Sequence, residues 1–473
     1  MLPRRLGLYA SFSIVVGAVI GSGIFMKPAV MAQQVGSPVW LIAVWVIAGL
    51  VSFIGGMINA EIGTILPETG GQYVFFKKMY GDFFAFIYGW AAFIVINTAA
   101  IAAIAFVFAQ YTEYFIGLPR FSPAVEKSFV LHLPGLGNLF PLENAGVKAL
   151  AIGILVLLTL INYVSVKAGS WVQVGSTFLK IGSLILLCIL VFASGNGDIG
   201  NWTRPDPGMQ KSGWALVMGI IAAMSGALAS FDGWNNLGFM AGEIKDPRKN
   251  IPRGLFLGIG ICMVLYVLTN LAYLYALPLD TMSKSSLVAA DAIRTTVGLT
   301  GGGLIALLVM ISTFGAVNGN LFPCARIQFA MAEEGNFFTR IGKVHPRFQT
   351  PGNALILQFV WTSLFVITGS FDMLTDLFVF ITWLFYGFGA FGLFILRKKM
   401  KEVERPYKVW GYPILPAIFI LFAAFYFFLT LYNDIQNYLQ GKTAFIQSVY
   451  GLILTFIGVP IYFYLHRRKR KNL

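Results

Sequence analysis

Apolar residues fill most of this chain in long runs that short polar segments separate. A helix of about 20 apolar residues can cross the roughly 30 Å hydrocarbon core of a bilayer. No polar domain or low-complexity tract interrupts the series. The pattern predicts twelve transmembrane helices, at about residues 7–33, 39–66, 83–116, 147–165, 170–194, 213–242, 251–277, 302–332, 353–370, 374–396, 412–431 and 444–465.

The amino-acid composition agrees with lipid as the solvent. Of the 473 residues, 57% are hydrophobic and only 11% are charged. Soluble domains carry about a quarter charged residues. The sequence is therefore that of an all-α integral membrane protein, and a soluble enzyme is excluded.

The net charge of +14 has an explanation in membrane topology. Lys and Arg in short loops remain on the cytoplasmic side, and with the N-terminus inside, the inner segments hold roughly three times as many as the outer ones. We therefore predict a multi-pass protein of the cell membrane with both termini cytoplasmic. The excess charge faces membrane lipid, and no nucleic-acid partner is expected.

Glycine and serine interrupt the first run at Gly17, Gly21, Ser22 and Gly23. Glycine destabilises helices, and unwound backbone inside a bilayer must be buried in protein or line a cavity. The free N–H groups of Ser22, Gly23 and Ile24 would then form an anion site, strengthened by the helix dipole. A helix-packing face from Gly17 to Gly21 explains the same residues, so this segment alone leaves both interpretations open.

The sixth run carries a second irregularity, because Ala229–Asn236 places an acid, a glycine and two amides among apolar residues. A charge in the membrane interior is costly unless it is partnered or faces water. Asp232 is therefore either a substrate contact or a hydrogen bonder that caps a helix break. Interruptions in the first and sixth runs, at matching places in two halves of five, favour the ligand site of an inverted-repeat transporter.

Lys180 lies near the middle of the fifth run, too deep to reach the interface easily. We predict that it points into the bundle at carbonyl oxygens or an acid. It would act as a structural brace, or stand where a coupling cation would otherwise bind.

Cysteine and histidine indicate no further chemistry. The three cysteines lie in apolar runs and predict no disulfide framework, and the three histidines lie far apart without ligand spacing. A polytopic membrane enzyme would show a cluster of such groups near the headgroups. We expect no metal, no cofactor and no enzymatic activity.

Six segments in order resemble the amino acid–polyamine–organocation superfamily, most closely its L-type amino-acid transporter branch and bacterial homologues. The resemblance covers nearly the whole chain, and each segment alone is weak. The segments are Ile20–Phe25, Pro67–Tyr73, Phe231–Asn235, Gly242–Pro252, Phe314–Gly319 and Arg397–Lys399.

The resemblance implies a LeuT-like fold of five plus five inverted repeats, with helices one and six unwound at mid-membrane. The transport core would span residues 1–396, with repeats at about 1–194 and 213–396. Residues 397–473 would add two helices and a basic tail.

The resemblance also implies the binding residues. Backbone N–H groups around Ser22, Gly23 and Ile24 would hold a substrate carboxylate, and carbonyls near Val19, Ala229 and Asp232 would meet the ammonium. Lys180 matches a lysine that replaces a sodium site and contacts carbonyl oxygen near Gly21, which implies sodium independence. The remaining implied substrate residues are Ser230 and Asn235.

Three departures from the family pattern matter. A bulky aromatic over the substrate is replaced by Ala229, which puts gating and size selection in doubt. A small hydroxyl that partners the lysine is replaced by Ala316, so Ser312 or a water would substitute. The loop at 117–146 holds no cysteine for a disulfide-linked heavy chain, so the chain is expected to work alone.

The sequence thus predicts a sodium-independent exchanger or uniporter of small neutral amino acids. The alternative is a proton-coupled symporter, or a carrier of cationic amino acids or polyamines. Only Asp232 supplies a carboxylate to the expected site, which argues against a cationic side chain. Proton coupling stays open because Lys180 could carry the proton.

Overall fold

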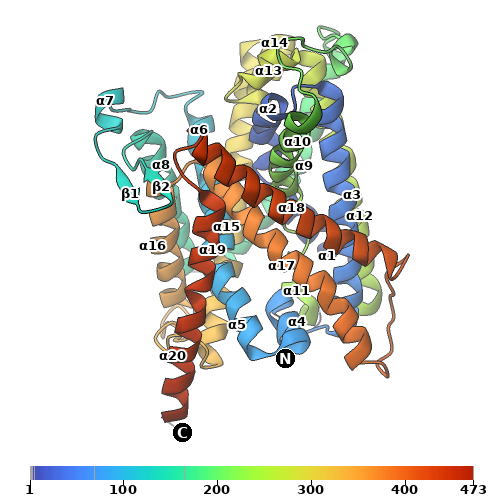
Figure 1. Ribbon diagram of the computed structural model, residues 1–473, viewed down its shortest axis with the longest axis vertical. Coiled ribbons are helices and arrows are strands. Elements are labelled where there is room, and N and C mark those ends of the chain that lie inside the picture. Colours follow the sequence, from blue (N-terminus) through green and yellow to red (C-terminus); the bar gives the residue numbers. More distant parts are fainter. Residues whose placement is uncertain (1–3, 5, 69, 165, 472–473) are drawn as a thin grey trace.

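The structure is a computed structural model that describes residue 4 and residues 6–68, 70–164 and 166–471, without the side chains of 166–176, 322–323 and 468–471. It is a helical bundle whose two chain ends lie at the same end of the molecule (Figure 1). A two-stranded hairpin, β1 (Leu131–Leu133) with β2 (Gly137–Leu139), lies in the loop between the third and fourth apolar runs.

The first half of the chain forms helices whose apolar stretches match the predicted runs. One of them contains a π-helical segment, η1, between two α-helical parts. In order they are α1 (Leu8–Val19), α2 (Gly23–Val35), α3 (Pro38–Ile65), α4 (Gly71–Tyr80), α5 (Asp82–Ala91), η1 (Ala92–Ile96), α6 (Asn97–Thr112), α7 (Pro123–Glu126), α8 (Ala145–Val164) and α9 (Val166–Ala193).

The second half of the chain also contains a broken run, at α10 (Gly213–Phe231) and α11 (Asn236–Phe239), and long helices follow it. In order, its elements are η2 (Ile199–Trp202), α10, α11, η3 (Ala241–Glu243), α12 (Pro247–Ala276), α13 (Leu279–Ser283), α14 (Val288–Val297), α15 (Leu299–Glu333), α16 (Gly352–Thr368), α17 (Phe371–Lys399), α18 (Ile414–Leu439), α19 (Gln447–Phe456) and α20 (Gly458–Lys471).

Nine helices within the described residues are long and apolar enough to cross a membrane. A tenth candidate is the bent pair of α1 and α2, whose axes differ by 42°. Two further apolar stretches, α16 (Gly352–Thr368) and the part of α9 whose side chains are described (Thr177–Ala193), are shorter than this test requires. The helical membrane architecture predicted from the apolar runs is therefore found, with nine or ten spans by length and composition.

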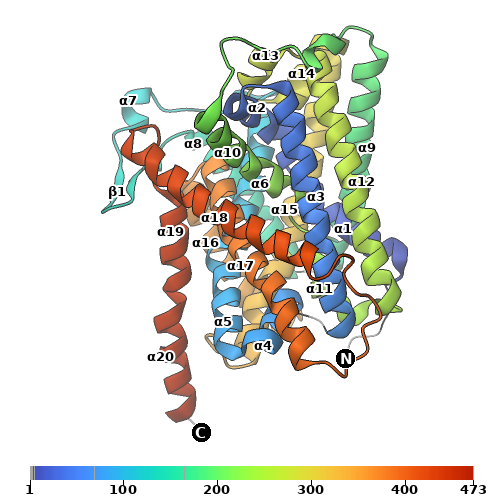
Figure 2. The ribbon, with the colours of Figure 1, turned by 45° about the vertical axis from the view of Figure 1, so that its right-hand side comes forward.

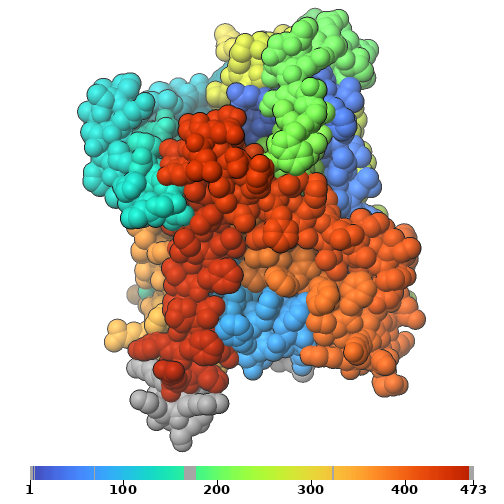
Figure 3. Space-filling model, in the orientation of Figure 1, coloured from blue at the N-terminus to red at the C-terminus, as the bar shows by residue number. Residues whose placement is uncertain are grey.

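Long helices pack in pairs around the centre of the bundle. α3 packs along α12, which also packs against α1, and α9 packs along α15 (Figure 2). α2 packs against α10, so the segments that follow and precede the two irregular stretches are neighbours. α18 and α20 lie on the outside of the bundle, and Figure 3 shows them covering one face.

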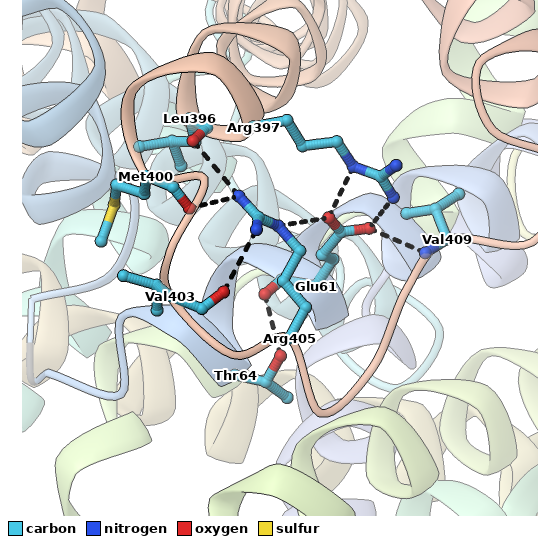
Figure 4. A network of polar contacts seen from close by, with 8 residues as sticks. All are labelled: Glu61, Thr64, Leu396, Arg397, Met400, Val403, Arg405 and Val409. Atoms are coloured by element: carbon cyan, nitrogen blue, oxygen red, sulfur yellow. Dashed lines mark hydrogen bonds and ion pairs between the residues drawn. The ribbon is translucent and has the colours of Figure 1, made fainter.

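A buried ion cluster fastens the segment after α17 to α3 (Figure 4). Arg397 donates to both carboxylate oxygens of the fully buried Glu61, at 2.8 and 2.6 Å. The Val409 N–H donates to the same carboxylate at 2.8 Å, and Arg405 lies 3.5 Å from it. A bidentate arginine and a backbone donor satisfy the carboxylate, so the C-terminal ends of α3 and α17 are held together.

Candidate functional site

The first apolar run is broken between α1 and α2. α1 ends at Val19, Ile20 leaves the helical region at ψ 89°, and α2 begins at Gly23. The N–H of Phe25 donates to the Ser22 carbonyl at 3.1 Å, but the N–H groups of Ser22, Gly23 and Ile24 have no hydrogen-bond acceptor among the described residues. Three donors at a helix N-terminus form the kind of site that binds an anion.

The sixth apolar run is broken between α10 and α11. α10 ends at Phe231, Asp232 is extended at ψ 155°, and Gly233 has φ +109°. A Cβ at Gly233 would lie 2.9 Å from the carbonyl of Ala18, so glycine permits both this backbone conformation and the close approach of the two breaks. The two irregular segments therefore face each other.

A cavity of about 100 Å³ lies at the two breaks. An apolar cavity of about 150 Å³ holds benzene, so the space suits a small solute. Residues predicted from the sequence form much of its wall: Val19, Gly21, Ser22, Gly23, Ala229, Asp232 and Asn235. The structure thus brings together most of the predicted substrate residues.

The remaining predicted residues lie behind this wall. Ile24 and Ser230 are buried, and the Ser230 hydroxyl donates to the Gly226 carbonyl at 2.8 Å. Lys180 donates to the carbonyl of Gly17 at 2.9 Å and is 1% exposed. The hydroxyl of Ser312 is buried without a hydrogen-bond partner among the described residues, and no bond from it to Lys180 is present.

Tyrosines that the sequence analysis did not single out hold the broken segments in place. The Tyr266 hydroxyl lies 2.8 Å from the Val19 carbonyl and 2.9 Å from the Ser230 carbonyl, so it links the two breaks. Tyr111 donates to the Phe25 carbonyl at 3.0 Å and Tyr273 to the Ile24 carbonyl at 3.3 Å. No local signal marks them, because a tyrosine in an apolar run is equally typical of core packing.

Polar groups on the opposite wall complete the cavity. The Tyr386 hydroxyl of α17 donates to Asp232 at 2.5 Å, and both residues line the space. The side-chain nitrogen of Asn97 and oxygen of Asn235 are buried and have no partner in the described part of the chain. Such groups are available to a polar ligand, because leaving them unpaired costs about 1–3 kcal/mol each.

We expect Tyr386→Phe to raise the KM for substrate about tenfold, or about 1.4 kcal/mol, because Asp232 loses its hydrogen-bond donor in the cavity wall. Transport by the purified variant in liposomes measures this effect. Tyr80→Phe is the matched control, because Tyr80 also loses one bond to α17, at the Phe388 carbonyl, outside the cavity. Equal KM values in the two variants would show that Asp232 and Tyr386 do not take part in substrate binding.

A buried cation, Lys27, lies near the cavity. Lys27 of α2 contacts Asp372 at 2.6 Å and Asp376 at 3.6 Å, both on α17. Asp376 also accepts a hydrogen bond from Ser225 of α10 at 2.6 Å. The cluster thus joins α2, α10 and α17 next to the cavity residue Phe371. Lys27 lies within the first predicted run, 7–33, and no local pattern in the sequence connects it to these partners.

Comparison with known proteins finds a family model and relatives that cover nearly the whole chain. The model of the amino acid permease family matches residues 6–464. The serine/threonine exchanger SteT of Bacillus subtilis is 30% identical, over 99% of this chain and 98% of its own length. The large neutral amino acids transporter small subunit 2 of Mus musculus is 32% identical, over 98% of this chain and 81% of its own.

A third relative, the human b(0,+)-type amino acid transporter 1, is 28% identical over 90% of this chain and 82% of its own length. All three relatives carry names of transporters, and the family match at residues 6–464 runs through both helix breaks. The resemblance drawn from the six motifs is thereby confirmed. The chain belongs to the amino acid permease family, within the amino acid–polyamine–organocation superfamily, and is a multi-pass membrane transporter of amino acids and not an enzyme.

Proposed function

We propose that this chain is a sodium-independent exchanger of small neutral L-amino acids in the cell membrane. The observation that carries the proposal is the set of free N–H groups at Ser22, Gly23 and Ile24, at the start of α2 beside a small cavity. A carboxylate is the group common to all amino acids, and a helix N-terminus with free donors suits it.

The other side of the cavity supplies acceptors for an α-ammonium group. Asp232 and the carbonyl end of α10 near Ala229 lie on it, together with the carbonyl of Val19. The Val19 carbonyl already accepts from Tyr266, but a carbonyl oxygen has a second lone pair. Donors on α2 and acceptors on α10 thus match the two charged ends of one amino acid.

Cavity size and charge support a small, neutral side chain. The space of about 100 Å³ must hold the whole ligand in this conformation. Asp232 is the only acidic side chain among the described lining residues, and Tyr386 already donates to it. A cationic side chain would require a further carboxylate, so these features favour substrates of the serine or alanine type, in keeping with the name of SteT.

We further propose the membrane arrangement that the family resemblance implies. The ten span candidates and the two shorter apolar helices together make twelve helices, with α1–α9 and α10–α17 as inverted repeats of five and the remaining helices added. Both breaks then lie at mid-membrane, both termini are cytoplasmic, and residues 397–473 lie outside the transport core. No disulfide-linked heavy chain is expected, because the described cysteines lie in α9, α12 and α15.

Counterflow into liposomes that hold the purified chain tests the proposal. A panel of amino acids should show serine, threonine and alanine as the strongest exchangers, with equal rates in sodium and potassium buffers. Uphill uptake driven by a pH gradient would instead assign the chain to the proton-coupled alternative. Strong counterflow of lysine or a polyamine with none of serine would contradict the neutral substrate class.

Substrate size should respond to Ala229, which lines the cavity where related transporters often carry an aromatic residue. We expect Ala229→Phe to reduce counterflow of leucine and phenylalanine at least fivefold more than that of alanine or serine, because the added ring of about 150–250 Å² removes side-chain space. Ala193→Phe at the exposed end of α9 is the control. An unchanged substrate ranking would place Ala229 outside the side-chain pocket.

A further inference from the structure

A second concavity of about 1090 Å³ lies away from the substrate cavity, between α16 on one side and α19 and α20 on the other. We call it the aromatic groove. Residues of α5 and η1 also line it, and residues 335–341, after α15, lie at one end. The described lining residues are Trp90, Phe93, Ile94, Gly335, Phe337, Phe338, Thr339, Arg340, Ile341, Leu357, Trp361, Leu454, Ile457 and Leu465.

The groove presents an apolar surface to its occupant. The indole N–H of Trp90 donates to the Leu454 carbonyl at 2.9 Å, and that of Trp361 donates to the Ile94 carbonyl at 2.8 Å. Both tryptophans thus have their polar atoms satisfied within the protein and offer only ring surface. Leu454 and Leu465 are eleven residue steps apart, or about 16 Å of helix, which is about half of a 30 Å hydrocarbon core. The groove therefore matches an acyl chain of one membrane leaflet.

Arg340 is the one cation among the described residues that line the groove. Arg340 is exposed, and its guanidinium makes no ion pair or hydrogen bond within the described part of the chain. The neighbouring Glu334 bonds to Lys77 of α4, which lies at the end of the molecule where both chain ends emerge (Figure 1). Arginine forms strong, paired hydrogen bonds with phosphate.

We propose that the aromatic groove is a binding site for an anionic glycerophospholipid of the inner leaflet, with one acyl chain along the groove and the phosphate at Arg340. The length of the apolar surface matches the acyl chain of such a lipid, and the arginine at one end matches its phosphate. A second protein chain would not require the cation, and a neutral lipid would not use it. The anionic charge of the cytoplasmic leaflet supplies the ligand at high local concentration.

The groove and the substrate cavity share one structural element. Phe93 and Ile94 of the π-helical η1 line the groove, whereas Ile96, the last residue of η1, and Asn97 line the cavity. Trp361 bonds to an η1 carbonyl from within the groove. A lipid seated there presses on the outer side of the segment whose inner side faces substrate, so binding at the two sites is coupled through η1.

Native mass spectrometry of the full chain in detergent tests the site, with phosphatidylglycerol and phosphatidylcholine of equal acyl length as probes. The wild type should bind one phosphatidylglycerol at least tenfold more tightly than phosphatidylcholine. Arg340→Gln should abolish this preference, and Leu357→Trp, which fills the groove, should weaken both lipids. Lys343→Gln removes an exposed cation from the same loop without touching the lining, so it should behave as the wild type.

Equal affinity of the wild type for the two lipids, or a preference that survives Arg340→Gln, would overturn the proposal and leave only nonspecific annular lipid. The coupling has its own measurement. Adding phosphatidylglycerol to phosphatidylcholine liposomes should change the KM for exchange in the wild type and in Lys343→Gln but not in Arg340→Gln. An identical lipid response in all three would refute the link through η1, whichever substrate the chain transports.

Discussion

Gly21→Val should lower amino-acid counterflow at least about 100-fold while the protein still inserts and folds, because the new side chain occupies the place of the substrate carboxylate. A Cβ at Gly21 would meet only the Val19 carbonyl, at 3.8 Å, and would otherwise stand in the cavity. Losing two or three hydrogen bonds to a charged group, each contributing about 1.5–3 kcal/mol, accounts for a loss of this size.

Gly21 is a cleaner probe than Gly23, although the sequence makes the two glycines look equivalent. A Cβ at Gly23 would clash with the Ser230 side chain and lie 3.1 Å from its Cα, so a side chain there must separate α2 from α10. Inactivity of a Gly23 variant therefore reports packing as well as binding. Gly153→Val on α8 is the matched control for Gly21→Val, since nothing lies near its Cβ. A correctly inserted Gly21→Val with full counterflow would show that the carboxylate does not bind here.

In Lys180→Ala the affinity for substrate should stay within about threefold of the wild-type value, whereas net flux should fall at least about tenfold. Binding survives because the carboxylate contacts come from backbone N–H groups, whereas the loss leaves the buried Gly17 carbonyl without its donor, at a cost of about 1–3 kcal/mol. The lysine braces α1 against α9, so its removal should disturb the change between outward-facing and inward-facing states. Scintillation proximity binding and initial rates of uptake separate the two effects.

The same charge makes a sodium site at this position unfavourable, so wild-type uptake should be equal with and without sodium. Lys148→Met is the matched control, since Lys148 is a second buried lysine that donates only to carbonyls, those of Phe140, Pro141 and Ile367, and does not line the cavity. Wild-type uptake that requires sodium, or intact flux in Lys180→Ala, would refute this role. If Lys180 cycles a proton, a pH gradient will drive uphill uptake in the wild type only.

The sequence predicts those features that depend on neighbouring residues. Apolar runs predict the helices, and clusters of glycine and polar residues at Gly21–Gly23 and Asp232–Asn236 coincide with the ends of α1 and α10. These signals are local, because glycine and unpaired polar groups weaken a helix where they stand. Through their motifs, the sequence also predicts several of the residues at the two breaks that line the cavity.

The tertiary partners could not be predicted from the sequence. Tyr266 bonds to Val19 across 247 residues, and Lys27 to Asp372 across 345. Such pairs depend on how helices pack, and no spacing rule connects residues so far apart in the chain. The helices themselves are local features, and the fifth and ninth predicted runs, 170–194 and 353–370, agree with α9 (Val166–Ala193) and α16 (Gly352–Thr368) to within a few residues.

The bonds from Lys180, Tyr266, Tyr273 and Tyr111 to the carbonyls around the first break have a consequence for binding thermodynamics. Because side chains of the protein satisfy these carbonyls, the helix stays broken when no ligand is present. A ligand that had to unwind an intact helix would bind only a minor population, and its apparent affinity would fall by that fraction. Here the receptive conformation exists before the ligand arrives. The interaction energy of a small ligand therefore remains available to shift the equilibrium between the outward-facing and inward-facing conformations.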